Sequence, residues 1–307
     1  MTTSPSPSSG ARAGSSSSTT SRPRRPRRGA APRSVARRGL GPLGGIVLAL
    51  VCVLMLLPVI WTVLSVIKPA NVAFANPPVL SFRPTLDAFV DLWQATYFYR
   101  YLINTFVVAL ISTLGALILG IPAAYALSRF PGWVSVALLL LALVFRSLPR
   151  FAIVLPMYDI ARNLGIYDTR WVLAVALMAI NQPFTIWLLR NFFAAIPREL
   201  DEAAMLDGCR RDQVLTRIMV PLLGPGILTS GIFVFFFAFQ EYLTAVVLTN
   251  TEAGTVPVFI ATQLGQTLPM LQQAGAAAVL LTVPVMIFAF VAQRYLVAGL
   301  SAGSVRG

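Results

Sequence analysis

The stretch IPRELDEAAMLDGCRRDQVLTRIMVPLLGP (residues 196–225) interrupts a chain that is otherwise mostly apolar. Residues 190–221, here called the charged loop, hold five of the 11 acidic residues of the chain and five arginines. Burying so many ionised groups in hydrocarbon is too costly to be tolerated. We therefore expect the charged loop to lie in water between two membrane-spanning segments.

Local chemistry predicts two short helices with a turn between them inside the charged loop. Pro197 suits a first helical turn, where its missing N–H is not needed, and acidic residues favour the same end of a helix. Gly208 can adopt the left-handed conformation that ends a helix. Asp212 is then expected to cap a second helix, which ends before Pro221.

The composition indicates a membrane protein. Of the 307 residues, 57% are hydrophobic and 11% are charged, whereas soluble domains have about 45–50% and about 25% respectively. Each membrane-spanning helix needs about 20 apolar residues. The chain therefore has room for a handful of spans but none for a soluble enzyme domain, and we predict an all-α polytopic membrane protein.

Six apolar segments form the predicted transmembrane domain, residues 42–297. They lie at about 44–67, 101–127, 133–158, 171–189, 222–248 and 274–296.

The third segment contains Arg146, Pro149 and Arg150, and we expect a single helix that is kinked near Pro149 or Pro156. Arginines in apolar surroundings face a cavity, pair with a neighbouring subunit or extend to the interface. The sequence leaves these roles open.

The basic residues predict the orientation in the membrane. Residues 1–41 contain nine of the 24 basic residues and are rich in Ser, Pro and Gly, so we expect a disordered tail. A basic run before an apolar span indicates a cytoplasmic flank and not a nucleic-acid site. With this tail inside, 17 basic residues lie on the inner side and five outside. We predict that both termini, including the tail at 298–307, and the charged loop are cytoplasmic.

Several kinds of chemistry are excluded by the residues that the sequence lacks. There is no histidine, and the two cysteines, Cys52 and Cys209, lie in an apolar span and in the charged loop, so they cannot pair. Metal sites built from His and Cys and His-based proton relays are therefore excluded. The chain also lacks the phosphate-binding pattern GxxxxGK[ST]. We expect no catalytic, cofactor or metal site.

Polar residues in or beside the spans are candidates for a substrate path, or they join helices by hydrogen bonds. They are Asn104, Asn181, Gln182, Gln240 and Glu241. A carboxyl at membrane level must be paired or hydrated. We therefore expect Glu241 near the outer interface or in a cavity. A secondary carrier would need such a carboxyl for proton coupling, and Glu241 is its only candidate.

The charged loop resembles the Glu-Ala-Ala loop of the membrane subunits of ATP-binding-cassette importers. In that family the loop forms a coupling helix that seats in a groove of a cytoplasmic ATPase subunit. The resemblance assigns the coupling to Glu202, Ala203, Ala204, Asp207, Gly208 and Pro221, and Ile218 and Pro225 extend the pattern. On this basis we expect Glu202 to supply the polar anchoring of the coupling helix and Gly208 its turn.

From the first span onward, the chain is similar to the second of the two paired permeases of maltose-type carbohydrate importers. Five stretches carry this similarity: Tyr101–Thr105, Ala123–Arg129, Trp187–Phe193, Gln240–Tyr242 and Gln293–Gly303. Two departures from the family pattern bear on the substrate. Phe239 and Gln240 stand where many relatives have Trp-Asn, and Arg146 and Arg150 are not expected of every member.

The resemblance implies a set of partners: a second permease, two cytoplasmic ATPase subunits that use ATP, and an extracytoplasmic binding protein that delivers a sugar. The implied place is the bacterial plasma membrane, and the implied mechanism is alternating access driven by ATP. An importer of a solute other than a sugar, or an ATP-independent secondary carrier, is the alternative.

Overall fold

The computed structural model describes residues 42–130, 132–264 and 267–303. The expected disordered tail at residues 1–41 lies outside this part. The chain divides into two units, Met1–Leu54 and Met55–Gly307. The described part of the first unit is the beginning of helix α1 (Pro42–Ile67), whose large apolar side chains are exposed, as suits contact with lipid.

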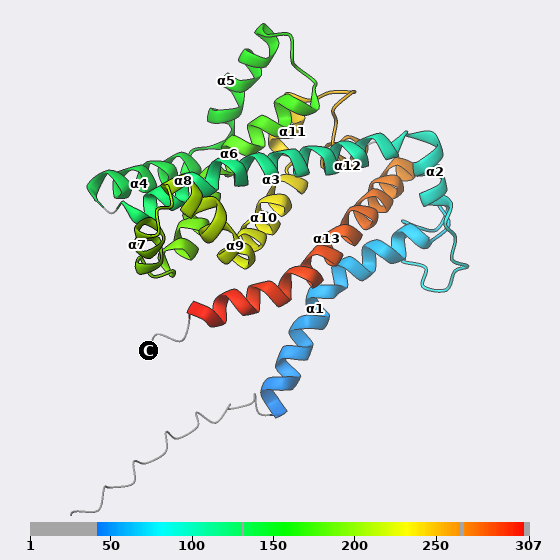
Figure 1. The fold of residues 1–307 in the computed structure, drawn as a ribbon. Helices are drawn as coiled ribbons and strands as arrows, with labels where there is room; N and C mark the ends of the chain where they lie inside the picture. The colour runs from blue at the N-terminus through cyan, green and yellow to red at the C-terminus, as the bar shows by residue number, and fades with distance from the viewer. Residues whose placement is uncertain (1–41, 131, 265–266, 304–307) are drawn as a thin grey trace, which may run out of the picture. The chain divides into compact units, whose positions relative to one another are not determined.

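Helices make up the second unit, and the described residues contain no strand (Figure 1). After α1 come α2 (Asp87–Ala95), α3 (Phe98–Arg129), α4 (Trp133–Ser147), α5 (Arg150–Asn163), α6 (Arg170–Ala194), α7 (Glu199–Leu206), α8 (Arg211–Gln213), a π-helix (Val214–Met219), α9 (Val220–Leu222), α10 (Gly224–Phe239), α11 (Leu243–Leu248), α12 (Val256–Gln263) and α13 (Leu268–Gly303).

Four helical segments in the described part are long and apolar enough to cross a membrane: Leu43–Ile67, Phe98–Arg129, Arg170–Ala194 and Leu268–Phe290. Two further pairs of segments are long and apolar enough to cross when each pair is taken as one segment, but each pair is sharply bent. They are α4 with α5, at 87°, and Arg211–Leu222 with α10, at 79°. There are six crossings if each bent pair counts as one span. The predicted all-α polytopic architecture is confirmed.

The third span differs from the single kinked helix that the sequence predicts. Helix α4 ends at Ser147, and Leu148 and Pro149 are extended, with ψ of 145° and 132°. The cause is local, because a residue before proline is driven away from the helical conformation. The chain resumes its helix at Arg150, while Pro156 lies inside α5 without ending it.

The predicted boundaries of the last two spans also change. The segment expected at 222–248 is divided into α10 and α11, because the helix is interrupted between Phe239 and Leu243. Helix α13 begins at Leu268 and continues to Gly303, so it starts before the segment predicted at 274–296 and includes residues of the predicted tail at 298–307. Hydropathy marks the apolar centre of a helix, and a helix can continue into polar flanks.

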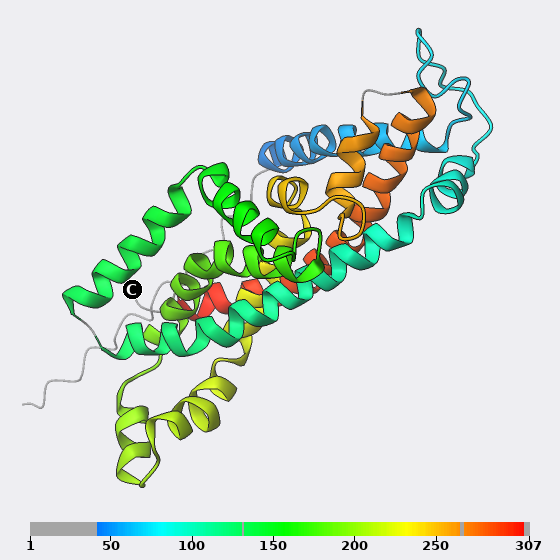
Figure 2. The same cartoon turned by 90° about the horizontal axis from the view of Figure 1, so that it is seen from above.

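The centre of the second unit is the pair of helices α3 and α6, which lie side by side (Figure 2). Gly120 of α3 allows this approach, because a Cβ atom there would lie 2.8 Å from the methyl group of Thr185 on α6. The buried polar residues of this pair, such as Ser112 and Thr113, mostly bond to carbonyls of their own helix. The two helices therefore form a packed unit. The charged loop begins at the end of α6 and contacts the end of α3.

Candidate functional site

The first helix of the charged loop, α7, is set by its two ends. It has Glu199, Asp201 and Glu202 in its first turn, where a helix N-terminus favours negative charge. Pro197 lies just before α7 and not within its first turn as predicted, because the first helical hydrogen bonds accept at Arg198 O.

The other end of α7 confirms the predicted role of Gly208. Gly208 has a φ of +88°, in the left-handed region. The N–H of Gly208 donates to Met205 O at 3.1 Å, and the N–H of Cys209 donates to Ala204 O at 3.0 Å. This pair of bonds is the Schellman arrangement, which satisfies the last carbonyls of a helix. The turn after α7 therefore depends on a conformation that glycine adopts without strain.

The second helix of the charged loop differs from the prediction. Its N-cap residue is Arg210, whose backbone N–H donates to Gln213 Oε1 at 2.9 Å, and Asp212 lies in the first turn and forms an exposed ion pair with Arg210. The segment also does not end before Pro221, because α8 passes through the π-helix into α9. The wide π turn precedes a proline that has no N–H to donate, so the regular hydrogen-bond ladder is already broken there.

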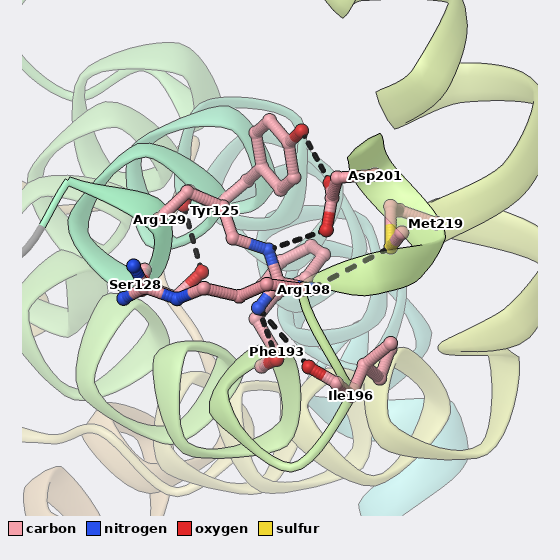
Figure 3. Close-up of polar contacts among 8 residues, drawn as sticks. All are labelled: Tyr125, Ser128, Arg129, Phe193, Ile196, Arg198, Asp201 and Met219. Atoms are coloured by element: carbon pink, nitrogen blue, oxygen red, sulfur yellow. Dashed lines mark hydrogen bonds and ion pairs between the residues drawn. The ribbon is translucent and has the colours of Figure 1, made fainter. Parts of the chain in front are cut away.

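Asp201 fixes α7 to the end of α3 (Figure 3). Its Oδ2 lies 2.8 Å from Arg129 Nε, and its Oδ1 accepts a hydrogen bond from the Tyr125 hydroxyl at 2.6 Å. The side chains of Asp201 and Arg129 are only 7% and 8% exposed, so their ion pair is largely shielded from water. Removing one partner of a buried pair leaves the other charge uncompensated, at a cost of about 3–5 kcal/mol.

The same arginine also fixes the end of α6 (Figure 3). Arg129 Nη1 donates to Phe193 O at 3.2 Å and to Ile196 O at 3.1 Å. These carbonyls lie where α6 ends and need partners from outside the helix. Arg198 donates in turn to Ser128 O at 3.3 Å. One guanidinium group therefore joins the ends of α3 and α6 to the beginning of the charged loop.

The residue that anchors α7 to the helices beside it is Asp201 and not Glu202, which we expected from the sequence. Asp201 and Ala204 are three positions apart, lie on one face of α7 and are buried. Glu202 and Ala203 lie on the other side and are exposed. Acidic residues at the start of a helix are evident in the sequence, but the face that each one occupies depends on where the helix packs. Glu202 is therefore available to a partner, and Asp201 is the internal anchor.

Asn104, a candidate for the substrate path, has a structural position instead. Its side chain is buried, and its Nδ2 donates to Glu252 O at 2.8 Å and to Gly254 O at 2.9 Å. Its Oδ1 accepts from Arg170 Nε at 2.6 Å. Both Nδ2 donors and the Oδ1 acceptor thus help to hold the segment after α11 against α3 and α6.

Asp168 holds the same segment and was not found from the sequence. Its carboxylate accepts hydrogen bonds from four successive backbone N–H groups, of Asn250, Thr251, Glu252 and Ala253, at 2.8–3.1 Å. Burial by itself raises the pKa of Asp168, but the four N–H donors outweigh it and hold the pKa below its usual value. This stabilisation is present above the usual pKa of an aspartate and is lost as the pH falls through the lowered value.

The remaining path candidates lie in different places. Asn181 is buried, 3% exposed, and Gln240 lines a cavity of about 380 Å³ together with residues of α12 and α13. Gln182 lines another cavity, of about 420 Å³, between α4, α5 and α6. Glu241 reaches this second cavity through Arg150, with Arg150 Nη1 3.3 Å from Glu241 Oε2.

The two arginines of the third span both line this second cavity. Arg146 lies over the rings of Phe184 and Phe237, at 5.0 and 5.5 Å from their centroids. The structure thus places Arg146 and Arg150 at a cavity, which was one of the roles that the sequence left open. We name the space lined by Arg146, Arg150 and Gln182 the basic cavity.

Helical spans joined by an internally anchored charged loop define a polytopic membrane protein. The chain belongs to the family of binding-protein-dependent transport system inner membrane components, whose model matches residues 116–302. It is therefore a multi-pass membrane permease subunit and not an enzyme, as the resemblance of the charged loop predicted.

Known relatives match most of the chain. The chain is 35% identical over 257 residues to the trehalose transport system permease protein SugB of Mycobacterium tuberculosis, covering 82% of this chain and 93% of the relative. It is 33% identical over 280 residues to the trehalose/maltose transport system permease protein MalG of Thermococcus litoralis, with 89% and 98% covered.

A solved structure supports the fold. A chain from the crystal structure of a bacterial ABC transporter involved in the import of the acidic polysaccharide alginate matches with a TM-score of 0.69 and 23% identity. The match covers 82% of this chain and 95% of that one. Two proteins with so few identical residues share the arrangement of helices, and the likeness therefore concerns the architecture alone.

We predict that Asp201→Asn loosens the charged loop. The substitution keeps an acceptor for Tyr125 but removes the charge that Arg129 needs. In a Cys52→Ser background, Cys209, which is partly buried in the same loop, should react with a maleimide about ten-fold faster or more. The control is Asp212→Asn, at the exposed pair with Arg210, which should leave the rate nearly unchanged. Equal rates in the Asp201 variant and its parent would contradict the anchoring role.

Proposed function

We propose that this chain forms half of the translocation path of a binding-protein-dependent importer of a sugar or oligosaccharide. The observation that carries the proposal is helix α7, which is fixed internally by Asp201 while its opposite face is open to a partner. The sugar is supported by relatives at 35% and 33% identity that are named for trehalose and for trehalose and maltose.

The open face of α7 has the properties of a docking surface. Leu206 is 89% exposed, and Met205 and Leu200 are also exposed, beside Glu202 and Ala203. Apolar side chains exposed on a helix within a charged loop are suited to a partner's groove. We infer that a separate ATPase subunit, which binds and hydrolyses ATP, receives this helix. Glu202, Ala203, Ala204, Asp207, Gly208 and Pro221 then form or support the coupling element.

The anchoring contacts supply the mechanical connection that coupling requires. A partner that displaces α7 also displaces Asp201, and the 2.8 Å ion pair transmits the displacement to the end of α3. Arg129 transmits it to the last carbonyls of α6 as well. Closure of two ATPase subunits would then rock this chain against a second permease between inward-open and outward-open states. An extracytoplasmic binding protein would deliver the solute.

We infer that the charged loop and both termini are cytoplasmic, where ATP is present. The inference rests on the excess of basic residues assigned to the inner side. In a Cys52→Ser background, a membrane-impermeant maleimide should label Cys209 in inverted vesicles and not in right-side-out vesicles. Labelling only in right-side-out vesicles would place the loop outside and remove the basis for coupling to a cytoplasmic ATPase.

We predict that Gly208→Val uncouples transport from ATP hydrolysis. A β-branched residue is strained at a φ of +88°, by about 1–3 kcal/mol, so the turn after α7 must change. In the assembled importer, substrate-stimulated uptake should fall about ten-fold while ATP hydrolysis persists. The control is Gly208→Asn, because asparagine tolerates the left-handed region. Normal stimulated uptake in the valine variant would refute the coupling role of this turn.

The proposed function as a whole is tested by purifying the assembly through a tag on this chain. We expect a second permease and an ATPase subunit to co-purify, and expect sugar together with the binding protein to stimulate ATP hydrolysis in nanodiscs. Stimulation by amino acids or metal ions and by no saccharide would replace the sugar with another solute. Uptake that proceeds without ATP would instead support a secondary carrier.

A further inference from the structure

The basic cavity has a volume of about 420 Å³ and lies at the bend between α4 and α5, with α6 forming its other wall. Most of its lining is apolar, with residues such as Leu141, Phe145 and Ile186. Three polar side chains converge on this apolar space: Arg146, Arg150 and Gln182. An apolar cavity with a few placed polar groups is the usual form of a site for a small ligand.

The charges at the cavity do not balance. Arg150 is paired with Glu241, whose other oxygen accepts from the N–H and the hydroxyl of Thr244 at 3.1 and 3.0 Å. Arg146 has no carboxylate within ion-pair distance among the described residues, which include every Asp and Glu of the chain. One positive charge therefore remains uncompensated at membrane level, where charge is costly.

Arg146 is exposed, and two aromatic rings lie beside its guanidinium group. The faces of Phe184 and Phe237 lie 5.0 and 5.5 Å from its guanidinium carbon, and such contacts orient a cation without neutralising it. An accessible guanidinium fork without a carboxylate partner suits bidentate binding of a planar or tetrahedral oxyanion.

Gln182 presents a second unsatisfied group. Its Oε1 is buried and has no hydrogen-bond partner among the described residues. A buried acceptor without a donor is unfavourable, but this oxygen has almost no accessible surface, so a solute would reach it only after the side chain turns towards the cavity. The cavity thus offers one unpaired anion-binding group, the guanidinium of Arg146 on α4, opposite a wall formed by α6.

We propose that the basic cavity is a subsite of the translocation path for acidic saccharides, which binds a carboxylate, sulfate or phosphate group of the sugar at Arg146. Glu241 holds Arg150 and limits the net positive charge. This proposal rests on the proposed sugar-import function and narrows its substrate class.

The experiment uses the complete assembly with its binding protein in nanodiscs of zwitterionic lipid, and measures the saccharide concentration that gives half-maximal stimulation of ATP hydrolysis. The probes are a uronic-acid disaccharide, a disaccharide phosphate, trehalose and maltose. For Arg146→Gln, the half-maximal concentration of the acidic probes should rise about ten-fold or more, the loss typical of a charged hydrogen bond. Arg146→Lys, which keeps the charge, should recover part of the loss.

Two further variants make the test specific. Arg162 is also an arginine over two rings, those of Tyr158 and Tyr167, but lies outside the cavity. Arg162→Gln should leave the half-maximal concentration unchanged. Glu241→Gln keeps an acceptor for Thr244 and removes one negative charge, so it should lower the half-maximal concentration of the acidic probes. The opposite signs of the two charge changes would not arise from misfolding.

Several results would overturn the proposal. Stimulation of the parent by neutral saccharides alone would leave the sugar importer intact and remove the acidic subsite. An Arg146→Gln effect that is equal for all saccharides, or loss of the co-purified permease, would assign Arg146 to a structural or subunit contact. An effect that appears only with anionic lipid would assign it to a lipid headgroup. No stimulation by any saccharide would overturn both this proposal and the sugar-import function.

Discussion

The buried ion pair between Arg129 and Asp201 is the contact on which the functional arrangement depends. It joins a short helix in a polar loop to the end of a long apolar helix, beside an apolar cluster that includes Ala204 of α7, Ala124 of α3 and Phe193 of α6. Apolar packing holds helices together but allows sliding, whereas charged groups with fixed hydrogen-bond directions define one position. The hydroxyl of Tyr125 and the carbonyls at the end of α6 complete this coordination. The loop is thereby tied to both helices of the central pair.

The sequence predicts the features that depend on neighbouring residues. Gly208 follows an acidic helix, and its left-handed turn is a local property that the structure confirms. The apolar segments likewise predict the helical, polytopic architecture, because hydrocarbon imposes it on any chain of this composition. Pro149 marks the position of the break in the third span. The bend there, 87°, depends on the packing of both halves and is sharper than the kink in a single helix that the sequence predicts.

Features that depend on tertiary contacts could not be predicted. Asp201 and Glu202 are adjacent acidic residues, and only the contact with α3 decides which of them becomes the anchor. Asp168 and Asn104 hold a segment more than 80 residues further along the chain, and no periodicity indicates such partners. The pair Arg150 and Glu241 is of the same kind. Each residue alone is a charged group in an apolar segment, and the ion pair between them compensates both charges.

Helix α6 connects the charged loop with the basic cavity. Gln182 lines the cavity, and Phe193, near the end of the same helix, offers its carbonyl to Arg129. Phe193 lies eleven positions after Gln182, which corresponds to about 16 Å at a rise of about 1.5 Å per residue. A helix of this length moves as a rod except where its hydrogen bonds are interrupted, and Pro183 interrupts them directly beside Gln182. A displacement delivered at the anchored end would therefore be expressed as a bend at the cavity wall, where the solute is proposed to bind.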